Sequence, residues 1–350
     1  MIDLSKDKLP NITNGNTPKN YELCQEGDIA FADASEDTNE VAKAVEFYKL
    51  KGKDVICGLH TIHGRDNLQK TVVGYKGYAF SSTAFHHQIR RIAQGTKIYS
   101  INSKNFSECY IGIPSKEEQK KIATLLRLID ERIVTQNKII EDLKMLKSAI
   151  IENVFDEKHS ERLQLDNVGS YIRGLTYSSN DVVEHGGTLV MRSNNIVNGS
   201  LLDYNNNVVF VNKQMSAEQQ LQNGDIVICM ANGSSSLVGK SSFYDGNCHS
   251  PITIGAFCGI YRSKEPIVKW LFQTNKYRRY IWNSLQGGNG AIANLNGEDI
   301  LNMSFSIPNA PIKDTCVKML TSVDSALENN MSLCALYTLQ KQHLLRQMFI

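Results

Sequence analysis

A fifty-residue segment occurs twice in this chain, and the repeat constrains the fold more than any other feature. Residues 106–155 align with residues 300–349 at a constant offset of 194, without a gap. The identical positions include the pairs Pro114 and Pro308, Asp130 and Asp324, Lys147 and Lys341, and Phe155 and Phe349. Upstream, EGDIAF at 26–31 corresponds to NGDIVI at 223–228, and AQG at 93–95 corresponds to LQG at 285–287. Self-similarity of this kind indicates a duplicated domain.

Each copy of the segment is predicted to form a long helix that follows a short strand and a proline. Ser115 and Glu118 have the spacing of a capping box, and Glu117 adds a second acidic residue to the first turn. No Pro or Gly follows before residue 155, so about 40 residues at 1.5 Å each predict a helix of roughly 60 Å. In the second copy Pro311 falls in the first turn, where proline is tolerated.

Both predicted helices carry an apolar seam with a period of 3.5 residues, and in each copy a polar residue interrupts the seam at the same two places. These residues are Gln136 and Lys147 in the first copy, and Asn330 and Lys341 in the second. A polar residue in such a seam lowers stability but fixes register. A single helix of this pattern would be read as a long surface helix, but matched interruptions predict that the two helices pack on each other. The expected packing residues are Ile122, Leu126, Ile129, Ile133, Ile140, Leu143, Leu320, Val323, Leu327, Tyr337 and Leu344.

The predicted fold class is α+β, with two mixed α/β domains separated by a pair of long antiparallel coiled-coil helices and related by a pseudo-two-fold internal repeat. The predicted bounds are 1–112 for the first domain, 113–157 for the first helix, 158–306 for the second domain and 307–350 for the second helix. A chain of 350 residues is long enough for each domain to bury a core of its own.

Composition favours an intracellular protein. The opening residues MIDLSKDKLP lack the apolar stretch of a signal peptide, and no segment has the roughly eighteen apolar residues that a membrane span needs. The eight cysteines are scattered without a C-x-x-C pair, which favours free thiols in a reducing cytoplasm. No metal site is predicted, because no two cysteines sit at ligand spacing. The expected localisation is cytoplasmic, with no membrane partner.

Positive charge gathers in two stretches of a chain whose net charge is only +2. Residues 67–107 hold no acidic residue and six basic ones, and residues 254–297 hold six basic residues against Glu265 alone. Two such stretches fit two surfaces that face phosphates, one in each copy. The alternative for either stretch alone is a solvated basic face.

The motifs of an enzyme are absent from the sequence. There is no G-x-x-x-x-G-K-[ST] loop, no G-x-G-x-x-G between a strand and a helix, and no Asn-Pro-Pro-Tyr of an adenine methyltransferase. His86 and His87 would point about 100° apart on a helix and form a poor metal site, so one is expected to be partly buried and the other exposed. The acidic cluster at 33–37 has no nucleophile with a base beside it. We therefore expect no catalytic residue and no cofactor bound by this chain.

The sequence resembles the specificity subunit of type I restriction–modification systems. The residues that carry the resemblance are IPSKEEQKKIATLLRLIDERI at 113–133, its weaker echo at 307–327, GDIAFADASED at 27–37, GLHTIHGR at 58–65 and QIRRIAQGTKIYSI at 88–101. The resemblance implies two target-recognition domains, each reading one half of a bipartite DNA site, with the helices setting the spacer between them. It also implies two partner methyltransferase subunits that use S-adenosylmethionine, and restriction or translocase subunits in the cleaving complex. The chain itself is then no enzyme.

The residues expected to contact DNA are polar and basic side chains in both copies. Arg suits guanine and Asn suits adenine in the major groove, and further Arg and Lys residues suit phosphates. The expected set in the first copy is Lys70, Lys76, Arg90, Arg91, Thr96 and Lys97. The expected set in the second copy is Arg192, Ser193, Asn194, Asn195, Ser234, Ser235, Ser236, Lys240, Arg278, Arg279, Asn289 and Asn294.

The two copies are unequal at their starts. About 60 residues, from Leu165, precede the end of NGD in the second copy, but only 27 precede Asp28 of EGD in the first. The first recognition domain is therefore expected to lack a piece of roughly 30 residues that corresponds to 166–196. A late start or truncated gene, a silent recombining cassette, and a variant with altered half-site reading remain open as explanations. The alternative function is a scaffold or competitor that binds partners but reads DNA poorly.

Overall fold

The long helices predicted from the repeat are both present in the structure, a computed structural model that describes residues 1–12, 21–156, 158, 161–285 and 293–349. They are α4 (Lys116–Val154) and α9 (Ala310–Met348), each of 39 residues. The Glu118 N–H donates to Ser115 Oγ over 3.3 Å at the start of α4, and Pro311 lies in the first turn of α9. The chain forms two units: residues 1–140 with 329–350 form unit 1, and residues 141–328 form unit 2. Part of each long helix therefore belongs to each unit.

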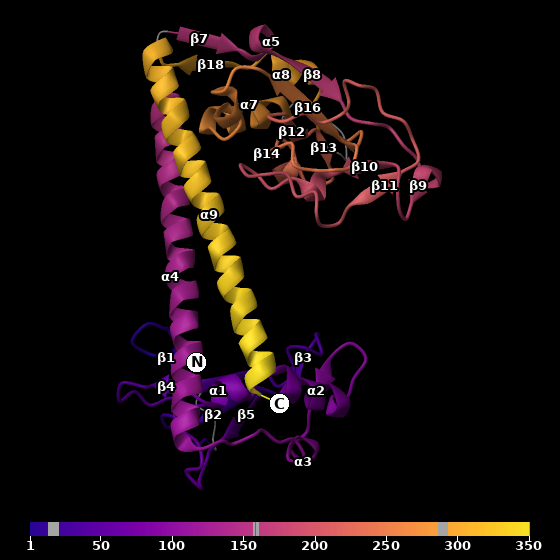
Figure 1. Cartoon of the computed structure of the whole chain (residues 1–350). Helices are drawn as coiled ribbons and strands as arrows, with labels where there is room; N and C mark the ends of the chain where they lie inside the picture. Colours follow the sequence, from indigo (N-terminus) through magenta and orange to yellow (C-terminus); the bar gives the residue numbers. More distant parts are fainter. Residues whose placement is uncertain (13–20, 157, 159–160, 286–292, 350) are drawn as a thin grey trace. The chain divides into compact units, whose positions relative to one another are not determined.

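The two helices contact each other inside each unit, and the contacts obey the repeat (Figure 1). In unit 1, Gln136 Nε2 donates to Asn330 Oδ1, which are the two matched polar residues of the seam. Also in unit 1, Lys341 Nζ lies 2.5 Å from Asp130 Oδ1. The corresponding ion pair in unit 2 joins Lys147 and Asp324 over 2.7 Å. Residue numbers fall on one helix as they rise on the other, so the helices run antiparallel, as predicted.

Every residue predicted to pack between the helices is buried or half-buried. Leu126 and Leu320 are fully buried, and Ile129, Ile140 and Leu327 are nearly so. The remaining members are half-buried: Ile122, Ile133, Leu143, Val323, Tyr337 and Leu344. The apolar seam therefore lies on the protected side of both helices.

An aspartate on each helix also holds the adjoining globular part of its unit. The Tyr78 hydroxyl donates to Asp130 Oδ2 over 2.8 Å in unit 1, and Trp270 Nε1 donates to Asp324 Oδ2 over 3.1 Å in unit 2. Each aspartate thus accepts from an aromatic donor and from the lysine of the other helix. This shared chemistry explains why the aspartates and lysines recur at the same places in both copies.

The globular part of unit 1 is a small mixed sheet with short helices. A four-stranded sheet has the order β1-β4-β2-β5, and a separate pair joins β3 to β6. The strands are β1 (Ile2–Asp3), β2 (Ile29–Ala32), β3 (Ala34–Ser35), β4 (Ala44–Lys49), β5 (Thr61–Gly64) and β6 (Tyr99–Ser100). The helices are α1 (Lys76–Ala79), α2 (Thr83–Ile92) and α3 (Ser103–Phe106). Phe31, Phe85 and Ile89 fill the core between sheet and helix α2.

Unit 2 contains a sheet of the order β14-β12-β16-β8, a second sheet of the order β15-β10-β11-β9, and the pairs β13-β17 and β18-β7. The strands of the first sheet and the two pairs are β7 (Glu161–Gln164), β8 (Gly169–Arg173), β12 (Ile226–Cys229), β13 (Ala231–Asn232), β14 (Ser241–Phe243), β16 (Cys258–Ser263), β17 (Ala293–Asn294) and β18 (Ser304–Ile307). The second sheet consists of β9 (Val182–Val183), β10 (Thr188–Met191), β11 (Val209–Val211) and β15 (Ile252–Ile254). The helices are α5 (Leu165–Val168), α6 (Val268–Leu271), α7 (Asn275–Leu285) and α8 (Gly297–Leu301), with 3₁₀ turns η1 (Ser179–Asp181), η2 (Ser193–Asn195) and η3 (Ser235–Leu237).

Most elements of unit 1 have a counterpart in unit 2, which confirms the duplication. The sheet order β4-β2-β5 corresponds to β14-β12-β16, the pair β3-β6 to β13-β17, and helices α1, α2 and α3 to α6, α7 and α8. An ion pair repeats as well: Arg65 binds Asp28 through Nε and Nη2, and Arg262 binds Asp225 in the same way. Unit 2 adds strands β9, β10 and β11, for which the described part of unit 1 has no counterpart.

The predicted domain bounds remain predictions, because the two units divide the long helices between them. All eight cysteines are free thiols. None of the helices in the described residues is long and apolar enough to cross a membrane.

Candidate nucleic-acid interface

The first group of predicted DNA contacts in unit 2 lies on turn η2, directly after the buried strand β10. Arg192 and Asn194 are exposed and Ser193 is half-exposed, so all three can reach a ligand. Asn195 is 1% exposed, and its side chain accepts from the Arg192 N–H and donates to the carbonyls of Asp203 and Asn206. The prediction that Asn195 contacts DNA is therefore wrong, since all its hydrogen-bonding capacity shapes the turn that presents Arg192.

The second group lies on the loop after strand β13. Ser234, Ser235 and Ser236 are exposed there, and the Ser234 N–H donates to Asn232 Oδ1 over 3.0 Å. Asn232 Nδ2 also donates to Ser193 Oγ over 3.4 Å, which connects this loop to turn η2. Asn294 is exposed on the partner strand β17, opposite Ala231. The pairing of β13 with β17 therefore brings Asn294 to the same loop, although it is about 60 residues away in the chain.

Helix α7 supplies the basic residues of the same surface. The Thr274 side chain caps it by accepting from the Tyr277 N–H over 3.0 Å. Tyr277 and Ile281, four residues apart, are buried, so Arg278 and Trp282 share an exposed side of the helix. Arg279 is exposed next to them.

The serine loop and helix α7 meet around a cavity of about 200 Å³. Its polar lining includes Ser235, Ser236, Lys240 and Arg278, four residues that the sequence placed on separate segments. Lys240 is half-buried there. Hydroxyls, an ammonium and a guanidinium around one hollow suit phosphate oxygens and base edges.

Two exposed aromatic residues of this region were missed by sequence reasoning. The Trp282 residue lines the same cavity and is 64% exposed. Phe257 is 67% exposed and lines a second cavity of about 420 Å³ together with Arg192 and Ser193. The available signal for Trp282 was its place in the polar helix KYRRYIWNSL, four residues after Arg278. Asn289 lies outside the described residues.

In unit 1 the predicted arginines lie on helix α2, the counterpart of α7. Ser82 caps this helix by accepting from the Phe85 N–H over 3.2 Å. Arg90 and Arg91 are exposed at its end, and Arg90 Nη1 donates to Asn39 Oδ1 over 3.0 Å. The helix thus presents two guanidinium groups in unit 1 as α7 does in unit 2.

The predicted residues Thr96 and Lys97 lie in the turn that leads from α2 to strand β6, and both are exposed. Gly95 makes this turn possible, since it has φ of +145° and a Cβ there would lie 1.9 Å from the Ile98 carbonyl oxygen. The turn closes with hydrogen bonds between Gln94 and Ser100. A side chain at Gly95 would therefore displace the segment that carries Thr96 and Lys97.

Lys76 does not belong to this surface. It is 7% exposed on α1, and Nζ lies 2.8 Å from Thr71 Oγ1 and 3.7 Å from the Glu46 carboxylate. Burial raises the pKa of Glu46, although the Gly77 and Gly74 N–H groups and Lys76 oppose the shift. The prediction of a DNA contact at Lys76 is therefore wrong, because the lysine offsets a buried carboxyl. Lys70 is exposed, as a contact residue must be.

The histidine pair behaves as expected, with His86 half-buried and His87 exposed. Burial, and then the charge of Arg90, lower the pKa of His86. His86 therefore adds no positive charge to α2 at neutral pH, and the basic character of this helix rests on its arginines.

A duplicated α/β fold that carries exposed Arg, Lys, Asn and Ser side chains on corresponding elements is typical of a protein that reads nucleic acid. Comparisons with known proteins agree. Residues 8–145 match the type I restriction modification DNA specificity domain. The chain belongs to the family of type I restriction–modification specificity subunits.

Two curated relatives are similar to part of the chain. The specificity subunit of the type I restriction enzyme EcoKI of Escherichia coli K12 is 34% identical over 158 residues, and that of StySPI of Salmonella potsdam is 33% identical over 156 residues. Each match covers 42% of this chain and 31% of the relative, so less than a third of each relative's length is spanned.

Two solved structures share the fold over nearly the whole chain. The S subunit of a type I restriction–modification system from M. genitalium has a TM-score of 0.58 at 15% identity, covering 97% of this chain and 87% of that one. A chain from a structure of complex assembly and conformational transition in the type I system has a TM-score of 0.54 at 14% identity, covering 94% and 83%. The predicted fold class is confirmed.

Proposed function

We propose that this chain is the DNA-recognition subunit of a type I restriction–modification complex and reads a bipartite site. The observation that carries the proposal is the meeting of Ser235, Ser236, Lys240 and Arg278 around one cavity of unit 2, in a chain whose residues 8–145 match a DNA specificity domain. Each unit reads one half-site through its own loops and helix. The alternative of a competitor with impaired reading gains no support from these contacts.

Within unit 2 the residues divide by what they can reach. Arg192 and Asn194 extend from a turn held by the buried Asn195, and a rigid support of this kind suits discrimination between bases. Arg278 and Arg279 on helix α7 bind phosphates and position the duplex. In unit 1, Arg90, Arg91 and Lys97 carry the corresponding phosphate contacts. Reading without catalysis is the whole contribution of this chain.

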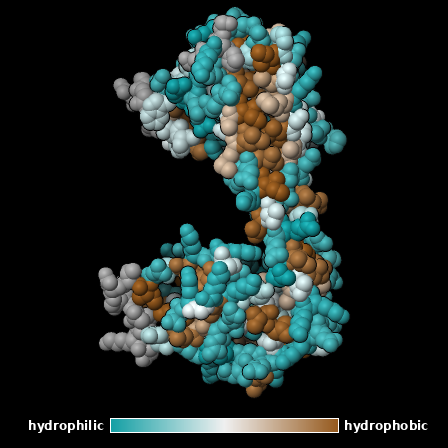
Figure 2. Space-filling model, turned by 90° about the vertical axis from the view of Figure 1, so that its left-hand side faces the viewer, coloured by the Kyte–Doolittle hydropathy of each residue, from teal (hydrophilic) through white to brown (hydrophobic). Residues whose placement is uncertain are grey.

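The partners are two methyltransferase subunits, joined by restriction or translocase subunits in the cleaving complex. Large apolar side chains remain exposed on both helices, and Figure 2 shows part of this surface as a brown band along them. They are Leu125, Leu128, Val134, Ile139, Met145 and Leu146 on α4, and Ile312, Met319, Met331, Leu333, Leu336 and Leu339 on α9. Exposed apolar surface of this extent marks a site of protein contact. The partner supplies S-adenosylmethionine and flips the target adenine out of the duplex. The complex works in the cytoplasm.

Methylome sequencing of the host with and without this gene tests the proposal. We expect one bipartite adenine motif to lose methylation on both strands when the gene is deleted. Complementation with the Arg192→Ala, Arg278→Ala double variant should leave that motif unmethylated while the variant still co-purifies with the methyltransferase subunit. An unchanged methylome after deletion would refute the assignment.

A further inference from the structure

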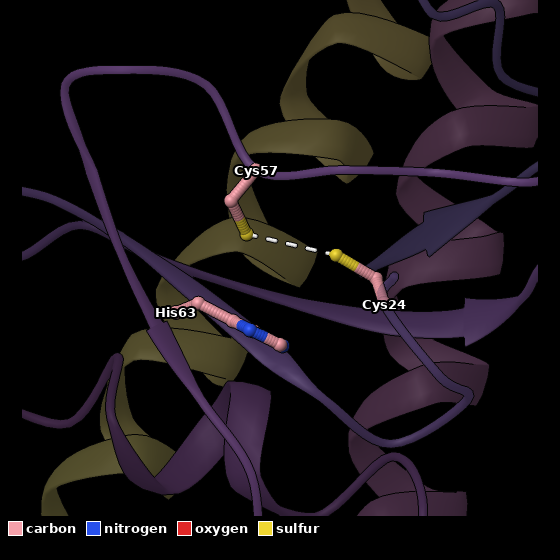
Figure 3. A group of neighbouring side chains, drawn as sticks. All are labelled: Cys24, Cys57 and His63. Atoms are coloured by element: carbon pink, nitrogen blue, oxygen red, sulfur yellow. Dashed lines mark hydrogen bonds between the residues drawn. The ribbon is translucent and has the colours of Figure 1, made fainter. Parts of the chain in front are cut away.

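Three side chains with metal-binding atoms meet in unit 1, away from any residue assigned a role above. They are Cys24, Cys57 and His63, and one ligand atom from each lies within 4.8 Å of the other two (Figure 3). Cys24 Sγ lies 3.6 Å from Cys57 Sγ. Two thiolates on one tetrahedral zinc ion, each about 2.3 Å from it, lie roughly 3.8 Å apart. The spacing of the sulfurs therefore already suits a shared zinc ion, whereas a disulfide requires about 2.05 Å.

Strand pairing produces this cluster. Leu23 and Ile56 form an isolated antiparallel bridge, which places Cys24 near Cys57. Strand β5 pairs with β2, which brings His63 to the same place opposite Ala30. The sequence predicted no metal site because the cysteines are 33 residues apart, but the sheet removes that separation.

Carboxylates flank both ring nitrogens of His63. Nε2 lies 2.9 Å from Asp28 Oδ2, and Nδ1 lies 3.5 Å from Glu22 Oε2. Whichever nitrogen binds an ion, the other faces a carboxylate that can hold its proton, as is usual for histidines that bind zinc. The side chain of Glu22 is 61% exposed and can reach the fourth position of a tetrahedral site, which water fills otherwise.

The internal repeat supplies an independent comparison. With Asp28 placed on Asp225 and Arg65 on Arg262, the counterparts of Cys24, Cys57 and His63 are Leu221, Ile254 and Ile260. The backbone agrees with this alignment: the Cys24 N–H donates to the Val55 carbonyl over 2.8 Å, and the Leu221 N–H donates to the Ile252 carbonyl over 3.0 Å. Three apolar positions of the second copy are therefore three metal-binding residue types in the first.

The surroundings of these positions differ between the copies. In unit 2, Leu221, Ile254 and Ile260 belong to one apolar core with Leu189 and Met191 of strand β10. The described residues of unit 1 include no counterpart of β10. Cys24 packs there with Phe47, Leu50 and Val55 in a much smaller core. Small cores are commonly reinforced by a structural metal ion, which contributes folding free energy directly.

We propose that Cys24, Cys57 and His63 hold a structural zinc ion that replaces, in unit 1, the apolar core present at the same positions of unit 2. The two soft sulfur ligands and the imidazole favour zinc over calcium or magnesium, which prefer oxygen ligands. The ion joins the segment before β2 to β5 and thereby stabilises the sheet of unit 1.

The test uses the full-length protein, purified without chelator and loaded with zinc chloride before gel filtration. We expect one equivalent of zinc per chain by plasma mass spectrometry, and a thiolate-to-cobalt charge-transfer band when cobalt is loaded instead. Cys57→Ser should reduce zinc at least tenfold. The matched control is Cys109→Ser, which changes another half-buried thiol of unit 1 and should keep full occupancy.

A second variant separates loss of metal from loss of fold. The triple change Cys24→Leu, Cys57→Ile, His63→Ile installs the residues of the second copy, and we expect it to fold without zinc and to lose the chelator sensitivity of the thermal transition. Zinc that stays bound to the triple variant, or a wild-type chain that takes up no zinc, would overturn the proposal. A metal-free protein lighter by two hydrogens would also overturn it, because the sulfurs would then form a disulfide. None of these outcomes bears on DNA reading.

Discussion

Asp130 and Asp324 occupy the same position of the repeat, yet their replacement by alanine is expected to have unequal effects. The Asp324 and Lys147 side chains are only 6% and 9% exposed, whereas those of Asp130 and Lys341 are 33% and 28% exposed. Asp324→Ala leaves the Lys147 charge buried without its partner and removes the acceptor of Trp270 Nε1. Breaking a buried ion pair in this way typically costs about 3–5 kcal/mol.

The matched change Asp130→Ala is expected to cost about 1–2 kcal/mol. The exposed ion pair contributes less than about 1 kcal/mol, and the lost acceptor of the Tyr78 hydroxyl contributes about 1 kcal/mol more. For a unit of this size, 1 kcal/mol corresponds to a change in melting temperature of about 2–4 °C. Asp324→Ala should therefore lower the melting temperature of unit 2 by on the order of 10 °C.

Urea and thermal unfolding of both variants measure these costs. The fluorescence of Trp270 and Trp282 reports on unit 2, which holds both tryptophans of the chain, and circular dichroism reports on the helices of both units. Adding Lys147→Met to Asp324→Ala should recover part of the stability, because no uncompensated charge stays buried. Equal costs for Asp130→Ala and Asp324→Ala, or no recovery in the double variant, would refute the argument from burial.

Three further outcomes are expected. Burial acts to raise the pKa of Asp324, but Lys147 and Lys269 lower it, and the net shift is downward from 3.8; its contribution to stability is therefore present above that pH and lost as pH falls further, and a pH series of urea midpoints should show this loss in the wild type but not in Asp324→Ala. Arg278→Ala should weaken binding of specific and nonspecific duplexes by the same factor and reduce the dependence of binding on salt by about one ion, as measured by fluorescence anisotropy; a loss confined to the specific duplex would assign the residue to base reading instead. Asn195→Ala should destabilise unit 2 by about 1–3 kcal/mol in the urea experiment, since it leaves the carbonyls of Asp203 and Asn206 and the Arg192 N–H without their partner; an unchanged midpoint with altered DNA specificity would restore it as a contact residue.

The prediction of the helices succeeded because their evidence is local and duplicated. A run without Pro or Gly, a capping serine and a seam with matched polar interruptions are visible in the residue order alone. The contact between Gln136 and Asn330, and the two exchanged ion pairs, follow from that register.

The errors in the candidate site have a common cause. Arg192 and Asn195 look alike as polar residues after a strand, and Lys76 looks like any lysine in a basic stretch. Composition does not reveal that Asn195 accepts and donates three hydrogen bonds inside the turn, or that Lys76 faces the buried Glu46. A polar side chain inside a protein must be satisfied there, so burial assigns it to the fold and exposure leaves it available to a ligand.

The duplication, the antiparallel pair of helices and the two basic stretches were determined by the sequence alone, because each depends on periodicity or composition along a continuous segment. Only the tertiary structure decided which polar residues share a surface and which distant residues meet. Strand pairing brought Asn294 to the serine loop and brought Cys24, Cys57 and His63 within reach of one ion. The physical reason is that hydrogen bonds between strands join segments 30 to 60 residues apart, and no local pattern records which segments they join.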